Sequence, residues 1–199
     1  RLLLGDPADV YVLEVSSFQL ENCPTFRPNI AVITNITNDH LDRYNSIEDY
    51  AKAKFKITTN QNKDDSFLFY AEDKIIKSRL NSVNASLYPI YTSTPINAPN
   101  QGAFIEDSHL IMITKNNDIM TIEDLALQGK HNTYNALAAG LSARLLNVRS
   151  EMVRESLADF EGLEHRMENI GTIHGIQFIN DSKATNVNST YYALESING

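Results

Sequence analysis

Apolar residues along the chain fall into short runs that are separated by polar turns. Residues 10–15 and 30–34 are continuous apolar runs without alternation, a pattern that favours strands covered on both faces, as in a parallel sheet. Residues 66–70 and 86–91 are expected to form two more strands. The sequence therefore predicts an α/β fold: a mostly parallel, Rossmann-like sheet of the P-loop NTPase type, flanked by helices.

Helical spacing marks the segments between these runs. Ser46 is expected to cap a helix whose first turn carries Glu48 and Asp49, and one face of that helix collects Tyr50, Ala51, Lys54 and Phe55. Further helices are predicted at residues 73–80, 133–146, 151–159 and 188–196. Short strands at residues 102–105, 110–114 and 119–122 predict an antiparallel β-ribbon beside the main sheet.

Composition narrows the class of protein. The 199 residues are 42% apolar, which supports a sizeable core and one or two domains. The formal net charge of −8 argues against nucleic acid or an anionic membrane surface as a partner, and no apolar run is long enough to span a membrane. The single cysteine, Cys23, excludes a disulfide within the chain and fits a reducing cytoplasm.

The Gly-containing polar break at residues 160–166 is where we expect a domain boundary, giving one domain at residues 1–161 and the start of a second α/β domain at 162–199. The chain begins with Arg1 and ends just as a helix finishes. We therefore expect it to be a fragment at both ends.

Two side chains of metal-binding type follow predicted strands. Glu14 lies near the end of the run at residues 10–15, and His40 lies in the loop after residues 30–34. A carboxylate at a buried strand end needs a cation, which can be a metal ion or a salt-bridge partner, unless it is protonated. A lone loop histidine is most often solvated, but its pairing with Glu14 on a neighbouring strand end favours a metal site.

Lys54 lies in the middle of an apolar helix stripe, whereas Lys52 and Lys56 point to solvent. Burial of an isolated lysine should lower its pKa and leave a neutral amine. Such an amine can take up carbon dioxide and become a carbamate, which binds metal. The alternative is that the ammonium reaches the surface or an acidic partner, and the residues alone favour this alternative.

Asn132 and Asn135 lie three residues apart at the start of a predicted helix and therefore share a face. Their amides each offer a donor and an acceptor, which suits the edge of a purine. Asn132 can equally be a simple N-cap, whereas a cap has no use for Asn135 inside the helix. Arg166, in the break between domains, is a candidate for pairing with phosphate, although most exposed arginines have no such role.

Residues 180–186, Asn-Asp-Ser-Lys-Ala-Thr-Asn, form a turn between a predicted strand and a helix. Ligands of open α/β sheets bind at such strand ends, and Asp181, Lys183 and Thr185 would suit a phosphorylated or carboxylated ligand. The alternative is a solvated loop in which Ser182 or Thr185 caps the helix.

Six segments, in this order, resemble the Mur ligases of peptidoglycan synthesis. They are residues 13–21, 35–44, 50–54, 129–136, 162–166 and 180–186. The first four are shared, more loosely, with folylpolyglutamate synthases. The last is specific, because family members that add other amino acids carry different sequences at this turn. It selects the members that add D-glutamate.

The resemblance implies an ATP-dependent ligase that adds D-glutamate to UDP-N-acetylmuramoyl-L-alanine through an acyl phosphate, with Mg²⁺ as cofactor. Its partners would be these small molecules alone, and the protein would be a cytoplasmic monomer. Carried over by position, the metal ligands are Glu14, His40 and carbamylated Lys54. The nucleotide contacts are Asn132, Asn135, Arg166, Asp181 and Lys183, the substrate contacts are Ser16, Gln19 and Thr185, and the catalytic residues are Lys54, His40 and Lys183.

One feature departs from the family pattern. The family carries a P-loop that ends in Gly-Lys-Ser/Thr ahead of the first strand, whereas the only Gly-Lys here, Gly129-Lys130, is followed by His131. We therefore expect the chain alone to be inactive. The alternatives are a folylpolyglutamate synthase-like ligase and a non-catalytic nucleotide-binding module without a P-loop.

Overall fold

The structure is a computed structural model that describes residues 8–37, 43–107, 109–114, 119–122, 130–160, 162–185, 187–195 and 197. The first half contains α1 (Ser17–Glu21), β1 (Ile30–Ile33), α2 (Ile47–Phe55), η1 (Lys56–Thr58), β2 (Ser66–Tyr70), α3 (Lys74–Arg79), η2 (Leu80–Ser82) and β3 (Ser86–Ile90). The second half contains β4 (Gly102–Glu106), β5 (His109–Ile113), β6 (Ile119–Ile122), α4 (Lys130–Leu145), α5 (Ser150–Ala158), β7 (Glu168–Ile173), β8 (Ile176–Asn180) and α6 (Val187–Glu195).

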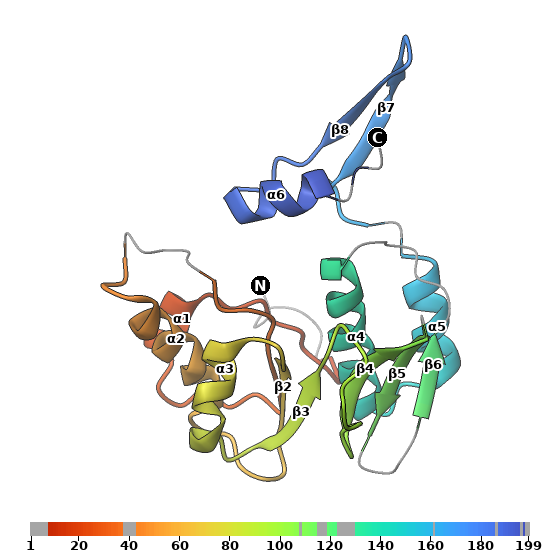
Figure 1. The fold of residues 1–199 in the computed structure, drawn as a ribbon. Helices are drawn as coiled ribbons and strands as arrows, with labels where there is room; N and C mark the ends of the chain where they lie inside the picture. Colours follow the sequence, from red (N-terminus) through yellow and green to blue (C-terminus); the bar gives the residue numbers. More distant parts are fainter. Residues whose placement is uncertain are drawn as a thin grey trace.

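One sheet with the order β1-β2-β3-β4-β5-β6 organises the larger part of the molecule (Figure 1). β1, β2, β3 and β4 pair in parallel, whereas β4, β5 and β6 pair antiparallel. This confirms the mostly parallel α/β fold. The antiparallel ribbon does not lie beside the main sheet but continues it, because Ala103 of β4 pairs with Ile90 of β3.

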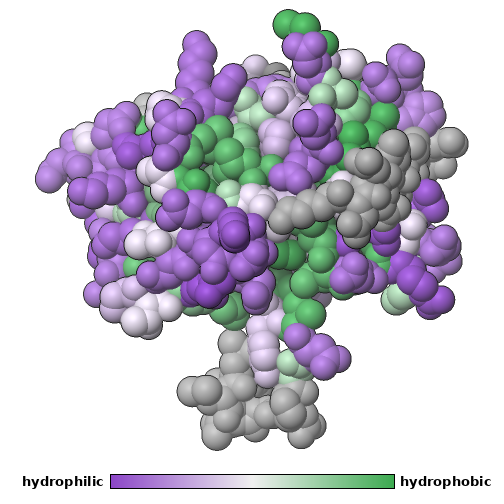
Figure 2. All heavy atoms as spheres, turned by 90° about the horizontal axis from the view of Figure 1, so that it is seen from below, coloured by the Kyte–Doolittle hydropathy of each residue, from purple (hydrophilic) through white to green (hydrophobic). Residues whose placement is uncertain are grey.

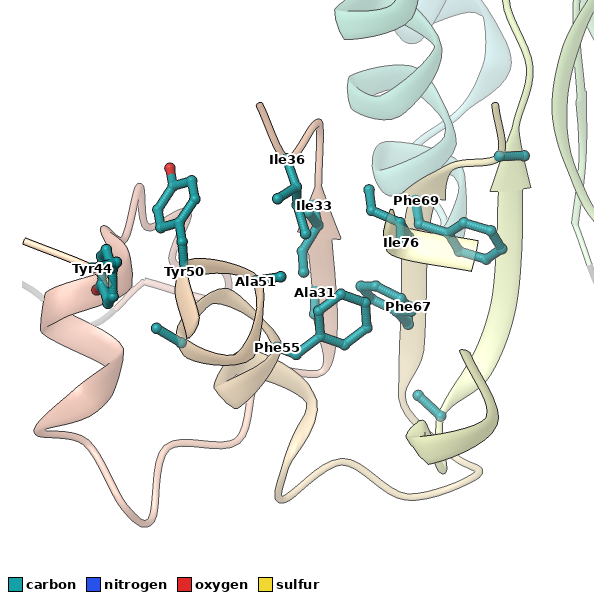
Figure 3. Packing of buried hydrophobic residues seen from close by; sticks show 13 residues of the cluster. Ala31, Ile33, Ile36, Tyr44, Tyr50, Ala51, Phe55, Phe67, Phe69 and Ile76 are labelled. Atoms are coloured by element: carbon teal, nitrogen blue, oxygen red, sulfur yellow. The ribbon is translucent and has the colours of Figure 1, made fainter. Parts of the chain in front are cut away.

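Alternation along β2 places hydrophobic side chains on both faces of the sheet. Phe67 and Phe69 pack with residues of α2 and α3, including Phe55 and Ile76 (Figure 3). Leu68, between them in sequence, belongs to the opposite cluster with residues of α4 and α5. The sheet is therefore covered on both sides, as its continuous apolar runs predicted. Seen from the side away from the hairpin, polar side chains dominate the rim and apolar ones gather toward the middle (Figure 2).

The strand predicted for residues 10–15 is not formed. These residues carry no strand assignment and pair with no strand in the part of the chain that the structure describes. Val12 is 91% exposed, and the apolar residues beside it are about half exposed. An apolar run becomes a strand only when a neighbouring strand satisfies its backbone groups, and that condition is not met here.

β7, β8 and α6 form a unit of their own, which we call the C-terminal unit. β7 and β8 make a two-stranded antiparallel hairpin that stands apart from the main sheet, with α6 near its base (Figure 1). The hairpin and the helix expose apolar side chains, among them Ile173, Ile176, Val187 and Leu194. The strand-turn-helix order predicted for this region is confirmed. No helix of the described residues is long and apolar enough to cross a membrane.

An ion pair joins the loop before β1 to the start of β2. Arg27 Nε donates to Asp65 Oδ2 over 2.8 Å, and the Asp65 side chain is 3% exposed. Burial alone would raise the pKa of Asp65, but the hydrogen bonds from Arg27 and the Asn62 amide, with the charge of Arg27, hold that pKa below its usual value. Because the folded pKa is lowered, the pair stabilises the fold above about pH 4, the unfolded pKa of an aspartate, and this stabilisation is lost as pH falls further.

The ion pair therefore predicts a pH-dependent difference between the parent and an Arg27→Met variant. In urea unfolding at pH 6 the variant should be less stable than the parent, because Asp65 stays buried without its cation. The difference should narrow as pH falls below about 4, where protonation of Asp65 removes its charge. A gap that stays constant down to pH 3 would show that the carboxylate is not what Arg27 stabilises.

Candidate functional site

A cavity of about 390 Å³ lies between α1 and α2. It is lined by Glu14, Val15, Ser16, Ser17, Gln19, Tyr50 and Lys54. Two of the predicted metal ligands, Glu14 and Lys54, therefore share one cavity although they lie far apart in the sequence. The third, His40, lies outside the described residues. Within those residues, the structure contains no group of three or more His, Cys, Asp or Glu side chains that could hold a metal ion.

Lys54 is held at the wall of this cavity. Ser46 caps α2 as predicted, accepting a hydrogen bond from the Asp49 amide, and the helix presents Lys54 half-buried on its inner face. The Lys54 Nζ donates to the Asn35 carbonyl over 3.0 Å and lies 4.9 Å from the centre of the Tyr50 ring. The ammonium is therefore tied to the carbonyl that follows β1.

Tyr50 was not singled out by the sequence, yet it lines the cavity and contacts Lys54. Figure 3 shows it on α2 beside Tyr44, and the two rings are 5.2 Å apart. Tyr50 could have been identified from the sequence by its position one helical turn before Lys54 on the same face of the helix.

Glu14 is exposed, and the burial argument for a cation at this position is therefore wrong for this structure. The carboxylate belongs to a segment that carries no strand assignment, and not to the end of a buried strand. It still lines the cavity that contains Lys54. An accessible carboxylate is an oxygen ligand of the kind that Mg²⁺ prefers, so the residue fits a metal role without the desolvation argument.

Ser16 and Gln19 bind one another across the first turn of α1. The Ser16 hydroxyl accepts from the Gln19 amide over 3.4 Å, and the Gln19 Oε1 accepts from the Ser16 amide over 2.8 Å, which together make a capping box. Both bonds have a structural purpose. Of the two polar atoms of the Gln19 side chain, they use the Oε1 and not the Nε2.

The start of α4 is anchored to the sheet by Tyr134. The Tyr134 hydroxyl donates to the Ile33 carbonyl over 3.3 Å, and its ring meets that of Tyr70 edge-on at 5.1 Å. Burial raises the pKa of Tyr134 above its usual value, so the hydroxyl stays neutral. α4 begins at Lys130, so Asn132 lies inside the helix and is not its N-cap. Asn132 is half-buried and Asn135 is exposed.

Two loops of the C-terminal unit are bonded together and bring three predicted residues to one place. The Asp181 Oδ1 accepts from the Met167 amide over 3.1 Å, and the Lys183 amide donates to the His165 carbonyl over 3.1 Å. Arg166 lies in the sequence between His165 and Met167, which make these two contacts, and its side chain is exposed. The side chain of Lys183 is also exposed, and only the backbone of this residue takes part in the hydrogen bond to His165.

Thr185 lies in a different cavity from Lys54. That cavity, of about 560 Å³, is lined by Ala184, Thr185, Val187, Thr190, Tyr191 and Leu194, all from the last turn and α6. The predicted site residues that the structure describes therefore fall into three groups: one at α1 and α2, Asn132 and Asn135 on α4, and one on the C-terminal unit.

Solved structures share this fold. MurF from Acinetobacter baumannii superposes with a TM-score of 0.66 at 19% identity, over 92% of this chain and 40% of that one. MurF from Thermotoga maritima, solved in complex with ADP, has a TM-score of 0.62 at 12% identity, over 91% of this chain and 42% of that one. Identities this low establish the fold alone.

The sequence matches the family description of the Mur ligase middle domain over residues 3–143. The chain belongs to the Mur ligase family. It is 50% identical over 193 residues to the UDP-N-acetylmuramoylalanine–D-glutamate ligase of Bacteroides thetaiotaomicron, a match that takes in 95% of this chain and 43% of the relative. The chain therefore spans less than half the length of the curated relatives it matches.

Proposed function

We propose that this chain supplies most of the ATP-binding core of an ATP-dependent ligase that joins D-glutamate to UDP-N-acetylmuramoyl-L-alanine. The observation that carries the proposal is the 50% identity to a ligase of that name over nearly the whole chain. The cavity that contains Glu14 and Lys54 supports it, because this pair had been singled out from the sequence. The substrate carboxylate would attack the γ-phosphate of ATP, and the amine of D-glutamate would then displace phosphate from the acyl phosphate.

The residues at the first cavity fit a magnesium-dependent reaction. Glu14 offers carboxylate oxygens, and His40 would join it from outside the described residues. As an ammonium Lys54 repels a cation, so it fits a metal site only after its neutral amine adds to carbon dioxide and releases one proton. Bound Mg²⁺ would neutralise the charge that develops on phosphate oxygens. Ser16 and Gln19 would contact the UDP-sugar substrate.

The remaining residues would bind nucleotide and amino acid. Asn132 and Asn135 would contact adenine from α4, with Arg166 and Asp181 on phosphate and ribose. Lys183, exposed on its loop, would neutralise the γ-phosphate, and Thr185 would face D-glutamate. These groups span the boundary that we place between residues 1–161 and 162–199. Closure of the two domains on ATP would bring Lys183 toward Lys54. We further propose that the protein is a monomer that acts in the cytoplasm.

Activity of the full-length protein tests this proposal. With ATP and Mg²⁺, it should release phosphate when given UDP-N-acetylmuramoyl-L-alanine with D-glutamate, and should release far less with L-glutamate or with a folate substrate. The 199-residue chain alone should show no turnover. Preference for the folate would favour a folylpolyglutamate synthase-like ligase, and ATP binding without any phosphate release would favour a non-catalytic module.

A further inference from the structure

One peptide unit at the end of β1 is held from both sides by charged groups. The Asn35 carbonyl accepts from the Lys54 Nζ over 3.0 Å, and the Ile36 amide donates to the Asp73 Oδ2 over 3.0 Å. The carbonyl and the amide belong to the same planar peptide bond and point in opposite directions. The peptide therefore lies between an ammonium on one side and a carboxylate on the other.

The two carboxylate oxygens of Asp73 accept hydrogen bonds from different parts of the chain. Its Oδ1 caps α3, accepting from the amides of Ile75 at 2.8 Å and Ile76 at 3.0 Å. Its Oδ2 is left for the Ile36 amide, 37 positions away in the chain. An N-cap needs only one acceptor atom, so the bond from Ile36 has no part in capping the start of the helix. Its effect is to fix the Asn35–Ile36 peptide relative to α3 and β2.

The orientation of that peptide decides where Lys54 can be held. Ile36 is 4% exposed and packs in the core, so its amide needs a partner within the protein. If the peptide turned over, the amide rather than the carbonyl would face Lys54, and two donors would oppose each other. Asp73 prevents this by accepting from the amide with a full negative charge, which makes the bond stronger than one between neutral groups.

We propose that Asp73 is a positioning residue: through the Asn35–Ile36 peptide it holds the Lys54 side chain at the wall of the cavity that Glu14 lines. A carbamate nitrogen retains one hydrogen, so the same carbonyl would orient Lys54 after carbamylation. This part rests on the proposed function. The link from Asp73 to Lys54 does not, because it concerns only atoms that the structure describes.

The test is the reactivity of Lys54 in the full chain, compared with that of Lys52 on the same helix and of Lys56 at its C-cap. Reductive methylation with formaldehyde, quantified on proteolytic peptides by mass spectrometry, gives all three rates in one experiment. In an Asp73→Ser variant, whose hydroxyl keeps the cap, Lys54 should react roughly fivefold faster, the ratio expected for loss of one hydrogen bond of ordinary strength. Lys52 and Lys56 are exposed and should not change.

A matched control lies at the other end of β2. Asp65 also accepts a backbone hydrogen bond, from Asn62 at 2.9 Å, but it has no link to Lys54. Asp65→Ser should therefore destabilise the chain without changing the ratio of Lys54 to Lys52 rates. If Asp73→Ser leaves that ratio unchanged while circular dichroism shows the variant folded, the proposal is wrong. Should Asp73→Ser fail to fold, the isosteric Asp73→Asn, which keeps one acceptor oxygen, replaces it with the same expected ratio.

The labelling experiment tests the role of Asp73, and the activity assay tests the proposed function, so one can be refuted without the other. Labelling needs no ATP. If Asp73→Ser raises the labelling rate of Lys54 but the full-length parent has no ligase activity, the positioning role of Asp73 is supported and the proposed function is wrong. In a full-length protein that is active, Asp73→Ser should lower kcat and leave the KM for D-glutamate within about twofold. A merely destabilising substitution such as Asp65→Ser should change neither at a temperature where both variants are folded.

Discussion

Replacing Lys54 by alanine in the full-length protein is expected to lower kcat by about 10³-fold, which corresponds to about 4 kcal/mol of transition-state stabilisation. The proposed role of Lys54 is to supply, as a carbamate, a negative ligand that holds a metal ion beside the reacting phosphoryl group, and metal ions contribute several kcal/mol to such reactions. The measurement is steady-state phosphate release with UDP-N-acetylmuramoyl-L-alanine and D-glutamate. The KM for ATP should change much less, because the residues proposed to bind the nucleotide are others.

Two further variants separate the carbamate from the positive charge. Lys54→Arg keeps a cation that can still donate to the Asn35 carbonyl, but a guanidinium does not form a carbamate, so its kcat should fall nearly as far as that of the alanine variant. Lys52→Ala, on the exposed side of the same helix, should retain the parent rate. Full activity in Lys54→Arg would refute the carbamate. Carbon-13 NMR with labelled bicarbonate should show a carbamate signal that is absent from both Lys54 variants.

The features that sequence predicted best were those set by neighbouring residues. The helix after Ser46 follows from a cap, an acidic first turn and apolar spacing, and the same spacing placed Lys54 on the inner face. Strands β2 and β3 followed from short apolar runs. In these cases the information lies within about ten residues, so no knowledge of the rest of the fold was needed.

Features that depend on distant partners were predicted less well. Residues 10–15 have the same apolar character as residues 30–34, yet only the second run lies beside a strand in the described structure. Glu14 was consequently expected to be buried and is exposed. The sequence predicts Asp73 only as the start of a helix, because its contact with Ile36 is made across 37 positions and leaves no local pattern.

The candidate site was predicted through its residue types more than its geometry. Glu14 and Lys54 line one cavity, whereas Thr185 lines another and His40 lies outside the described residues. Asp181 and Lys183 do lie near Arg166, because the Asp181 side chain and the Lys183 amide bond to Met167 and His165, its neighbours in sequence. Which of these residues act on the same ligand stays a prediction from the motifs, and the relative position of two domains is not a property of any motif.

Tyr134→Ala is expected to destabilise the chain by about 3–5 kcal/mol, the usual cost of removing a large aromatic side chain from a core. Tyr134 is 6% exposed, packs edge-on against Tyr70 and donates to the Ile33 carbonyl, so its loss detaches the start of α4 from β1 and β2. The measurement is urea unfolding followed by circular dichroism, with the free energy extrapolated to water.

Tyr134→Phe isolates the hydroxyl from the ring. It keeps the packing and removes one hydrogen bond, so its cost should be about 1 kcal/mol. Asn132 and Asn135 lie on the same turns of α4, and for that reason Tyr134→Ala should also weaken nucleotide binding by the full-length protein at temperatures where the variant is folded, whereas Tyr134→Phe should bind almost normally. Equal stability losses in the two variants would mean that the hydrogen bond to Ile33, and not the packing of the ring, fixes α4 on the sheet.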